Sequence, residues 1–235
     1  MTTALVTGAN KGLGLETARR LVALGHTVFL GARDERRGKE AAERIGAHPV
    51  RIDVTDDATV EAAVRHVRTR TEHLDVLVNN AGITGPLKEA SALTADDIRS
   101  VYETNVFGVV RVTQAFLPLL RAAASPTVVN VSSGLGSLAI AQDPAAYEHL
   151  LPVYFASLGY NSSKAALNML TAQYAHEHPG VRFNAVDPGW TATDLNGNRG
   201  VQTVEEGAQI IVDMALADAA GPTGGFFGNT GPVPW

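Results

Sequence analysis

The sequence has no cysteine among its 235 residues. This absence excludes a disulfide scaffold, a zinc or iron–sulfur site with cysteine ligands, and a thiol nucleophile. An excess of positive charge is also missing, because 19 Lys and Arg stand against 24 Asp and Glu, which gives a formal net charge of −5. Proteins that bind nucleic acid or an anionic membrane usually carry a basic surface. The composition therefore predicts neither kind of partner.

Long hydrophobic runs are absent as well. No run approaches the length of about 18 apolar residues that a membrane-spanning helix needs, so no transmembrane segment is expected. The first eight residues, MTTALVTG, contain no basic segment of the kind that opens a secretory signal. We therefore expect a cytoplasmic protein. Its hydrophobic content of 45% is enough to build a buried core without covalent cross-links.

Short apolar runs alternate with longer amphipathic stretches along almost the whole chain. Most of the runs are continuously apolar, which is typical of strands that are buried on both faces of a sheet. The gaps between them hold helical patterns, so the order predicts βαβ units and a parallel sheet. The seven runs are 4–6, 27–30, 49–52, 76–78, 127–131, 182–186 and 225–227.

Glycines mark the ends of two predicted helices. The helices expected over 16–24 and 35–45 stop at Gly25 and Gly46, and glycine is the usual residue just after a helix C-terminus. Right-handed crossovers between parallel strands then make the sheet doubly wound. The predicted fold class is α/β, with a predominantly seven-stranded parallel sheet and helices on both of its faces.

Capping boxes mark the beginnings of two further helices. Thr94 and Asp97 have this spacing, with Asp in place of the usual Glu. They open a long helical pattern that is expected to close near Pro118. Thr203 and Glu206 have the same spacing and open the last predicted helix.

The whole chain, residues 1–235, is predicted to form a single domain, because it contains no break in composition, no low-complexity linker and no internal repeat. One region interrupts the alternation of strands and helices. At about 136–158 the chain holds glycine, proline and aromatic residues without a clear period. We interpret this region as an insertion on the one domain.

Three glycines follow the first predicted strand at the spacing G-x-x-x-G-x-G. Gly8 permits a tight turn, Gly12 lets the backbone approach a phosphate, and Gly14 allows a helix to pack closely on a strand. The N-terminus of the following helix offers free N–H groups and the positive end of its dipole to a pyrophosphate. The alternative is a glycine-rich turn that serves packing alone. The loop is not a P-loop, because no G-K-[ST] follows.

Tyr160 and Lys164 are four residues apart, so they share one face of a helix. The ordinary pKa of tyrosine is about 10, and a nearby ammonium lowers this pKa toward the range that suits acid–base catalysis. The alternative is a surface pair, because this spacing is common by chance.

Ser133 follows a buried strand at the edge where parallel sheets bind ligands. Its hydroxyl can stabilise a developing alkoxide, or it is a turn serine that bonds its own backbone.

These motifs, taken together and in order, resemble the short-chain dehydrogenase/reductase family, and within it the carbonyl-reductase-like branch. The resemblance covers nearly the whole chain, and the set of motifs is far more specific than any one of them. The matching residues are Thr7–Gly14 (T-G-x-x-x-G-x-G), Asp53-Val54, Asn79-Asn80-Ala81-Gly82, Asn105, Val131-Ser132-Ser133-Gly134, Tyr160-x-x-x-Lys164 and Pro188-Gly189-x-x-x-Thr193.

The resemblance implies a Rossmann-type fold and an NADP(H)-dependent oxidoreductase that reduces a ketone or aldehyde, its small-molecule substrate, to an alcohol. Tyr160 would give the proton, and Asn105 would help to hold a water in a proton relay with the lysine. The implied catalytic residues are Asn105, Ser133, Tyr160 and Lys164. The implied cofactor-binding residues are Gly8, Asn10, Lys11, Gly12, Leu13, Gly14, Arg33, Asp53, Val54, Asn80, Ala81, Gly82, Tyr160, Lys164, Pro188, Gly189, Thr191 and Thr193.

The residues near the end of the second predicted strand favour NADP(H) over NAD(H). A dinucleotide-binding fold often carries an acid about 20 residues after the glycine loop to bind the ribose, whereas an arginine there suits a 2′-phosphate. Arg33 stands at this place, and Lys11 lies in the loop that would face the same phosphate. In the family, members that prefer NAD usually carry the acid where Ala32 stands. Asp34 could bind the ribose instead or cap the next helix, and we prefer the cap.

The histidine pair His176 and His178 lacks a third ligand in the sequence, so we interpret it as the polar end of a helix and predict no metal site. The insertion implies a monomer rather than a dimer, because related enzymes cover an oligomerisation surface with a similar segment. The expected substrate is an apolar ketone of the cyclic or aromatic type. The residues behind that expectation are Leu135, Leu138, Ile140, Phe155 and Trp190.

Three other functions compete with a carbonyl reductase. A non-catalytic regulator that binds a dinucleotide would keep the glycine loop but would have no use for the complete catalytic set. A nucleotide-cofactor methyltransferase would favour an acid at the end of the second strand and would leave Tyr160 and Lys164 idle. An alcohol dehydrogenase that works in the oxidative direction would use the same residues, and the sequence does not set the direction.

Overall fold

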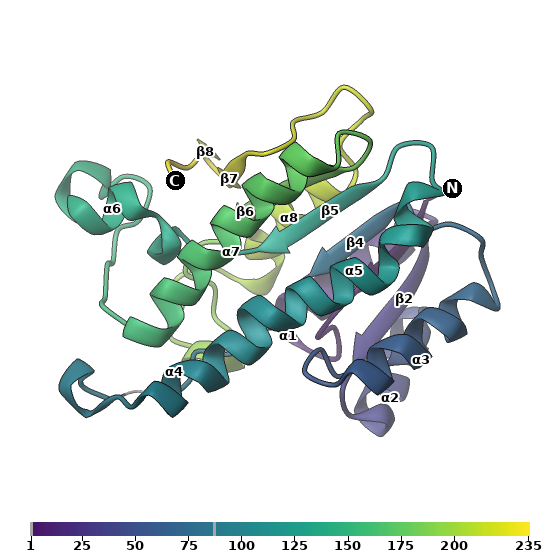
Figure 1. Cartoon of the computed structure of the whole chain (residues 1–235), viewed down its shortest axis with the longest axis horizontal. Helices are drawn as coiled ribbons and strands as arrows, with labels where there is room; N and C mark the ends of the chain where they lie inside the picture. The colour runs from purple at the N-terminus through teal and green to yellow at the C-terminus, as the bar shows by residue number, and fades with distance from the viewer. Residues whose placement is uncertain (1, 87) are drawn as a thin grey trace.

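A computed structural model describes residues 2–86 and 88–235. Its described strands form one sheet in the order β3-β2-β1-β4-β5-β6-β7-β8 (Figure 1). Neighbours from β3 to β7 are parallel, as the sequence predicts. The strands are β1 (Thr3–Val6), β2 (Thr27–Ala32), β3 (His48–Arg51), β4 (Val76–Asn79), β5 (Thr127–Val131), β6 (Arg182–Asp187), β7 (Phe226–Gly228) and β8 (Gly231–Pro232).

The strand count differs from the predicted seven by the short strand β8, which pairs antiparallel with β7. It consists of Gly231 and Pro232 alone. Both residues are disfavoured in strands, and two residues cannot form an apolar run. The strand exists because the chain turns back at Asn229 and Thr230 and pairs with β7 as a short hairpin.

Helices cover both faces of the sheet, which explains why the strands are apolar on both sides. One buried cluster joins strand residues to α1, α2 and α8, and a second joins the opposite face to α3, α5 and α7. In Figure 1, α5 and α7 cross the sheet in front, and α1 and α8 lie behind it. The helices are α1 (Gly12–Ala23), α2 (Glu35–Ile45), α3 (Asp57–Arg68), α4 (Ala95–Tyr102), α5 (Gly108–Arg121), α6 (Leu138–Gln142), α7 (Leu158–Glu177) and α8 (Val204–Ala215).

The predicted capping residues act as expected. Gly46 ends α2 in the left-handed conformation with φ of 77°. Complete capping boxes begin α4 at Thr94 and α8 at Thr203. The first helix differs from the prediction, because α1 begins four residues earlier, inside the glycine-rich loop at Gly12.

The long helix after Thr94 differs from the prediction in two ways. A π-helical turn, η2 (Glu103–Phe107), separates α4 from α5, and Pro118 lies within α5 instead of ending it. Proline cannot supply the N–H that would bond the carbonyl of Gln114. Both residues are exposed, so water can satisfy that carbonyl and the helix continues.

The predicted insertion forms α6 and a 3-10 turn, η4 (Pro144–Tyr147), followed by residues 148–157 without helix or strand. It packs beside the C-terminus, where the N–H of Ala139 donates to the carbonyl of Trp235 at 3.0 Å. Ile140 is fully buried in a small cluster with Phe226 and Val233. In Figure 1, α6 lies at the same end of the molecule as β7 and β8. No described helix is long and apolar enough to cross a membrane.

Candidate active site

The glycine-rich loop is tied to the end of β4. Gly8 has a φ of +63°, and a Cβ on it would lie 2.9 Å from Cα of Ala81. The side-chain amide of Asn80 donates to the carbonyls of Thr7 at 2.9 Å and Gly8 at 3.2 Å. A Cβ on Gly14 would collide with the same amide. The loop therefore needs glycine at these places because two strand ends meet there.

The beginning of α1 is suited to an anion. Gly12 opens the helix with φ of +55°, its N-cap residue Lys11 makes no side-chain cap bond, and the first turn holds no acid. The first N–H groups of a helix lack partners within it, and here no capping side chain takes them. A dinucleotide pyrophosphate therefore fits this loop. Of the remaining loop residues, Asn10 lies in the turn and Leu13 packs against the core.

The residues predicted to select the cofactor are only partly brought together. Arg33 is exposed, and its Nε lies 4.0 Å from Oδ2 of Asp53, so two neighbouring strand ends meet. Asp34 accepts a hydrogen bond from the N–H of Arg37 at 2.9 Å and caps α2, which confirms the preferred interpretation. Nζ of Lys11 lies 2.8 Å from Asp194, and its contact with the 2′-phosphate stays a prediction. This exposed ion pair is weak.

The segment after β4 leads from the glycine loop to the catalytic residues. A Cβ on Gly82 would lie 3.4 Å from Oδ1 of Asn105 and 3.7 Å from Nζ of Lys164. Val54, next to Asp53, packs against Gly108 at the start of α5. Cofactor-binding and catalytic candidates thus lie along one edge of the sheet.

Asn105 lies in the π-helical turn and is almost fully buried. Its Oδ1 accepts from the N–H of Ile83 at 2.9 Å, and its amide donates to the carbonyl of Ile83 at 2.9 Å and to Oγ of Ser163 at 3.0 Å. These bonds join the π turn to the segment after β4 and to α7. They satisfy the polar atoms of the buried Asn105 side chain. The role of Asn105 in a water relay stays a prediction.

Tyr160 and Lys164 lie on one face of α7, as the spacing predicts. Nζ of Lys164 donates to the carbonyl of Val131 at 2.7 Å and lies 5.6 Å from the centroid of the Tyr160 ring. Ser133 follows β5 directly, and its hydroxyl lowers the pKa of Tyr160. It also accepts from the N–H of Leu135 at 3.3 Å. The neighbouring serine, Ser132, is buried and committed to Asn168 at 2.5 Å.

The pKa of Tyr160 shifts in the direction opposite to the prediction. Burial raises it above the ordinary value, the charge of Asp187 raises it further, and the hydrogen bond with Ser133 opposes them. Burial also lowers the pKa of Lys164 to about 8, against a raising effect of Asp187. The sequence argument considered only the effect of a nearby ammonium on the phenol, whereas burial penalises the charged forms of both Tyr160 and Lys164.

Asp187 is a residue that the sequence analysis missed. It ends β6 at 8% exposure, and its Oδ1 accepts from the N–H of Gly189 at 3.0 Å. Burial raises the pKa of its carboxyl group, and the backbone hydrogen bonds and Lys164 lower it. An acid directly after the apolar run 182–186 was the signal that could have found it.

The loop after β6 lies close to the glycine-rich loop. Gly189 has a φ of +74°, and Oγ1 of Thr191 donates to the carbonyl of Pro188 at 3.1 Å. Thr193 packs near Gly12, where a Cβ would lie 3.6 Å from its Cγ2. The structure therefore brings this predicted cofactor segment to the loop at the start of α1.

The apolar residues expected to contact the substrate differ in accessibility. Leu138 and Phe155 are exposed by 63% and 45%. Leu135 is buried, and Ile140 is fully buried in the cluster with Phe226. We therefore withdraw Ile140 as a substrate contact, because the packing of the insertion uses it.

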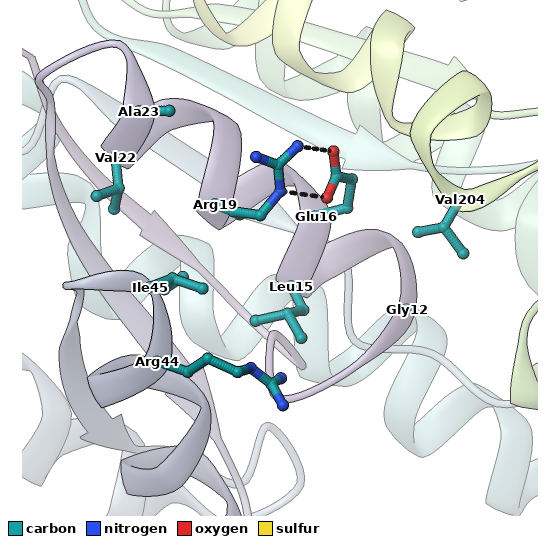
Figure 2. A pocket seen from close by; sticks show the side chains of 9 residues that line it. All are labelled: Gly12, Leu15, Glu16, Arg19, Val22, Ala23, Arg44, Ile45 and Val204. Atoms are coloured by element: carbon teal, nitrogen blue, oxygen red, sulfur yellow. Dashed lines mark hydrogen bonds and ion pairs between the residues drawn. The ribbon is translucent and has the colours of Figure 1, made fainter.

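A groove of about 500 Å³ lies on the outer side of α1 (Figure 2). Apolar side chains from α1 and α2 line it, among them Leu15 and Ile45, and Arg19 pairs with Glu16 along one wall. Gly12 connects the groove with the loop at the start of α1, but the catalytic candidates do not line it. The groove is therefore separate from the catalytic candidates.

The described residues contain no group of three or more His, Asp or Glu placed to hold a metal ion. His176 lies in the last turn of α7, and His178 follows its end. The ring of His178 stacks on Tyr174 with 5.9 Å between centroids. The pair therefore lies at a helix end, as interpreted from the sequence.

A doubly wound sheet with a glycine-rich loop, and with serine, tyrosine and lysine side chains at its carboxyl edge, defines a nicotinamide-dependent oxidoreductase of the Rossmann type. The chain belongs to the short-chain dehydrogenase family, whose sequence model matches residues 2–203. This family binds a nicotinamide dinucleotide.

Several characterised relatives are similar along almost their full length. A (+)-neomenthol dehydrogenase from Capsicum annuum is 32% identical, with 95% of this chain and 94% of the relative covered. A (−)-isopiperitenone reductase from Mentha piperita is 32% identical, with 95% of each chain covered. The crystal structure of an NADPH-bound carbonyl reductase from chicken fatty liver superposes with a TM-score of 0.85 at 32% identity and covers 100% of this chain and 99% of its own.

Proposed function

We propose that the protein is an NADPH-dependent carbonyl reductase that converts a ketone or aldehyde to an alcohol. The observation that carries the proposal is the meeting of Ser133, Tyr160 and Lys164 at the carboxyl edge of the sheet. The same edge holds the uncapped start of α1. Relatives named as reductases over nearly the full chain support this choice of chemistry.

The roles of the side chains follow from their positions. The hydroxyl of Ser133 holds the carbonyl oxygen and stabilises the charge that develops on it. The phenol of Tyr160 donates the proton to this oxygen, and burial keeps the phenol protonated. The ammonium of Lys164 stabilises the phenolate that remains after transfer. When bound, NADPH supplies the hydride that reduces the carbonyl carbon.

NADP(H) is the proposed cofactor. We propose that the whole chain forms a single domain and that this domain binds the cofactor. The loop residues from Gly8 to Gly14 would hold the pyrophosphate, and the exposed guanidinium of Arg33 would bind the 2′-phosphate. Asp34 is committed to capping α2, so it does not compete for the ribose. Lys11 would have to leave Asp194 to reach the phosphate, which is inexpensive for an exposed ion pair.

An apolar ketone is the proposed substrate, because Leu138 and Phe155 leave large apolar side chains exposed on the insertion. A panel of cyclic and aromatic ketones and diketones, followed by NADPH oxidation at 340 nm, ranks the candidates. NADH is run in parallel.

The substitution Tyr160→Phe tests the proton donor. We expect it to lower kcat by at least about 100-fold, because general acid catalysis contributes 10²–10⁴-fold. Tyr174→Phe is the matched control on the same helix, and it should keep the wild-type rate. Equal rates for Tyr160→Phe and wild type would refute the proposed mechanism. Tight NADPH binding without turnover of any carbonyl would instead indicate a dinucleotide-binding regulator.

A further inference from the structure

Arg111 is a charged residue of α5 that has no part in the mechanism above. Its Nε donates to Oδ1 of Asp57 at 2.5 Å, its Nη1 to the carbonyl of Val54 at 2.6 Å and its Nη2 to Oε1 of Glu103 at 3.0 Å. The side chain is 20% exposed. A guanidinium presents its donors in a fixed planar fork, so the three acceptors are held in one arrangement around it.

The three acceptors belong to two segments of the site. Two of them lie in residues 53–57, between β3 and the first residue of α3, a segment that contains two predicted cofactor-binding residues. We call this segment the 53–57 turn. The third acceptor, Glu103, opens the π-helical turn that carries Asn105. Arg111 therefore joins a cofactor-binding candidate segment to one that holds a catalytic candidate.

Close packing at the start of α5 joins the same two segments. A Cβ on Gly108 would lie 2.8 Å from Cγ2 of Val54 and 3.2 Å from its carbonyl oxygen, so only glycine lets the 53–57 turn approach so closely. The N–H of Gly108 donates to the carbonyl of Glu103. Glu103 and Asn105 are two residues apart in the π-helical turn, so a change in the position of one also affects the other.

We propose that Arg111 is a positioning residue that keeps the 53–57 turn ready for the cofactor and holds Asn105 in its place in the site. The inference rests on the proposed reductase function, in which the cofactor contacts the 53–57 turn and Asn105 serves catalysis. Without the guanidinium, two carboxylates and one carbonyl lose their shared donor, and the turn gains other conformations. Cofactor binding would then have to order the turn, which weakens binding.

The first test measures cofactor binding and needs no turnover. Arg111→Met keeps an unbranched apolar stem and removes the donors. By isothermal titration, we expect it to raise the Kd of NADPH and of NADH by the same factor of about 10, because hydrogen bonds to a charged group contribute at least that factor. An unchanged Kd for both cofactors overturns the proposal. A loss confined to NADPH would mean a contact with the 2′-phosphate and would also overturn it.

Arg182 supplies the matched control at the opposite edge of the sheet, where β6 begins. Its guanidinium also bridges several partners, among them Oγ of Ser125 at 2.6 Å and Oγ1 of Thr127 at 2.6 Å. Arg182→Met should lower stability and leave the Kd of both cofactors unchanged. An equal rise of Kd in the two variants would mean that the loss of any such arginine weakens binding through the fold, and it would overturn the proposal.

The second test observes Asn105 itself and needs no cofactor. Its side-chain amide donates to the carbonyl of Ile83 and to Oγ of Ser163, and such buried bonds slow hydrogen exchange. In protein labelled with ¹⁵N-asparagine, Asn105→Ser assigns the amide signal. We expect Arg111→Met to speed the exchange of this amide by about 10-fold, the same factor as for binding. An unchanged exchange rate overturns the proposal.

Two milder variants serve if Arg111→Met does not fold. Arg111→Lys keeps the charge but not the planar fork, and Glu103→Gln keeps the shape of its partner without the charge. Each should raise the Kd of both cofactors and speed the exchange of the Asn105 amide, and the absence of these changes in both variants overturns the proposal. A wild type that binds neither cofactor refutes the proposed function, and the exchange rate of Asn105 then decides this inference by itself.

Discussion

Lys164 and Asp187 are buried at the carboxyl edge of the sheet, and Tyr160 is half-buried there. Each of them is charged in one of its protonation states, and burial disfavours that state in all three. Burial therefore raises the pKa of Tyr160 and lowers that of Lys164. The protonation of these side chains depends on desolvation as well as on their spacing along α7.

Arg33 provides a prediction at the scale of one residue. Arg33→Ala should weaken NADPH binding by about 10–100-fold, because hydrogen bonds to charged groups contribute about 1.5–3 kcal/mol. Binding of NADH, which has no 2′-phosphate, should not change. Isothermal titration with both cofactors measures the difference.

Arg36 supplies the control for this comparison. It is also exposed and pairs with Glu40 within α2, so Arg36→Ala should bind both cofactors like wild type. Equal loss of NADPH and NADH binding in Arg33→Ala would mean that the arginine supports the fold of the loop instead of the phosphate.

The capping box of α4 carries a prediction at the scale of an element. Oγ1 of Thr94 accepts from the N–H of Asp97 at 3.2 Å, and the N–H of Thr94 donates to Oδ2 of Asp97 at 2.9 Å. Thr94→Ala should lower the free energy of unfolding by about 1 kcal/mol. Thr94→Ser keeps the hydroxyl and should lose much less, as measured by urea denaturation.

The same box gives a dependence on pH. The hydrogen bond from the N–H of Thr94 has the largest effect on Asp97, and the hydrogen bond from Lys88 has the next largest. Together they lower the pKa of Asp97 from 3.8 to about 2. A depressed folded-state pKa means that its stabilisation is present above pH 3.8 and is lost as the pH falls through about 2. The gap in unfolding free energy between wild type and Asp97→Asn should therefore narrow between pH 7 and pH 3. A constant gap would contradict the assigned role.

Element boundaries show which signals were local. Capping by Asp34, Thr94 and Thr203 was predictable, because each side chain bonds the backbone three residues on. The π-helical turn at Glu103–Phe107 was not predictable. Within it, Asn105 bonds Ile83 and Ser163, and both partners are distant from it in the sequence. The interior position of Pro118 depends in the same way on which side of α5 meets water.

For the whole molecule, the edges of the sheet favour a monomer. Strand β3 at one edge contains Pro49, and β8 at the other edge has only two residues. Both features discourage pairing of strands between molecules. The insertion packs beside the C-terminus. Light scattering coupled to size exclusion should give the mass of one chain at micromolar concentration, and a mass twice as large would contradict this expectation. The cytoplasmic location stays a prediction.

The sequence by itself determined the doubly wound α/β fold, and it placed three of the predicted site residues at the carboxyl edge of the sheet. Continuous apolar runs specify buried parallel strands, and capped amphipathic stretches specify the helices between them. Ser133, Tyr160 and Lys164 were predictable because short motifs next to those elements place them at the ligand-binding edge. These are local properties of the chain, and the strand order follows from few allowed topologies.

Only the tertiary structure decided how these residues act on one another. Lys11 pairs with Asp194, which is distant in sequence. The direction of the pKa shift of Tyr160 depends on desolvation by elements that meet at the sheet edge. Burial and through-space charge are properties of the assembled fold, so no local pattern could have reported them.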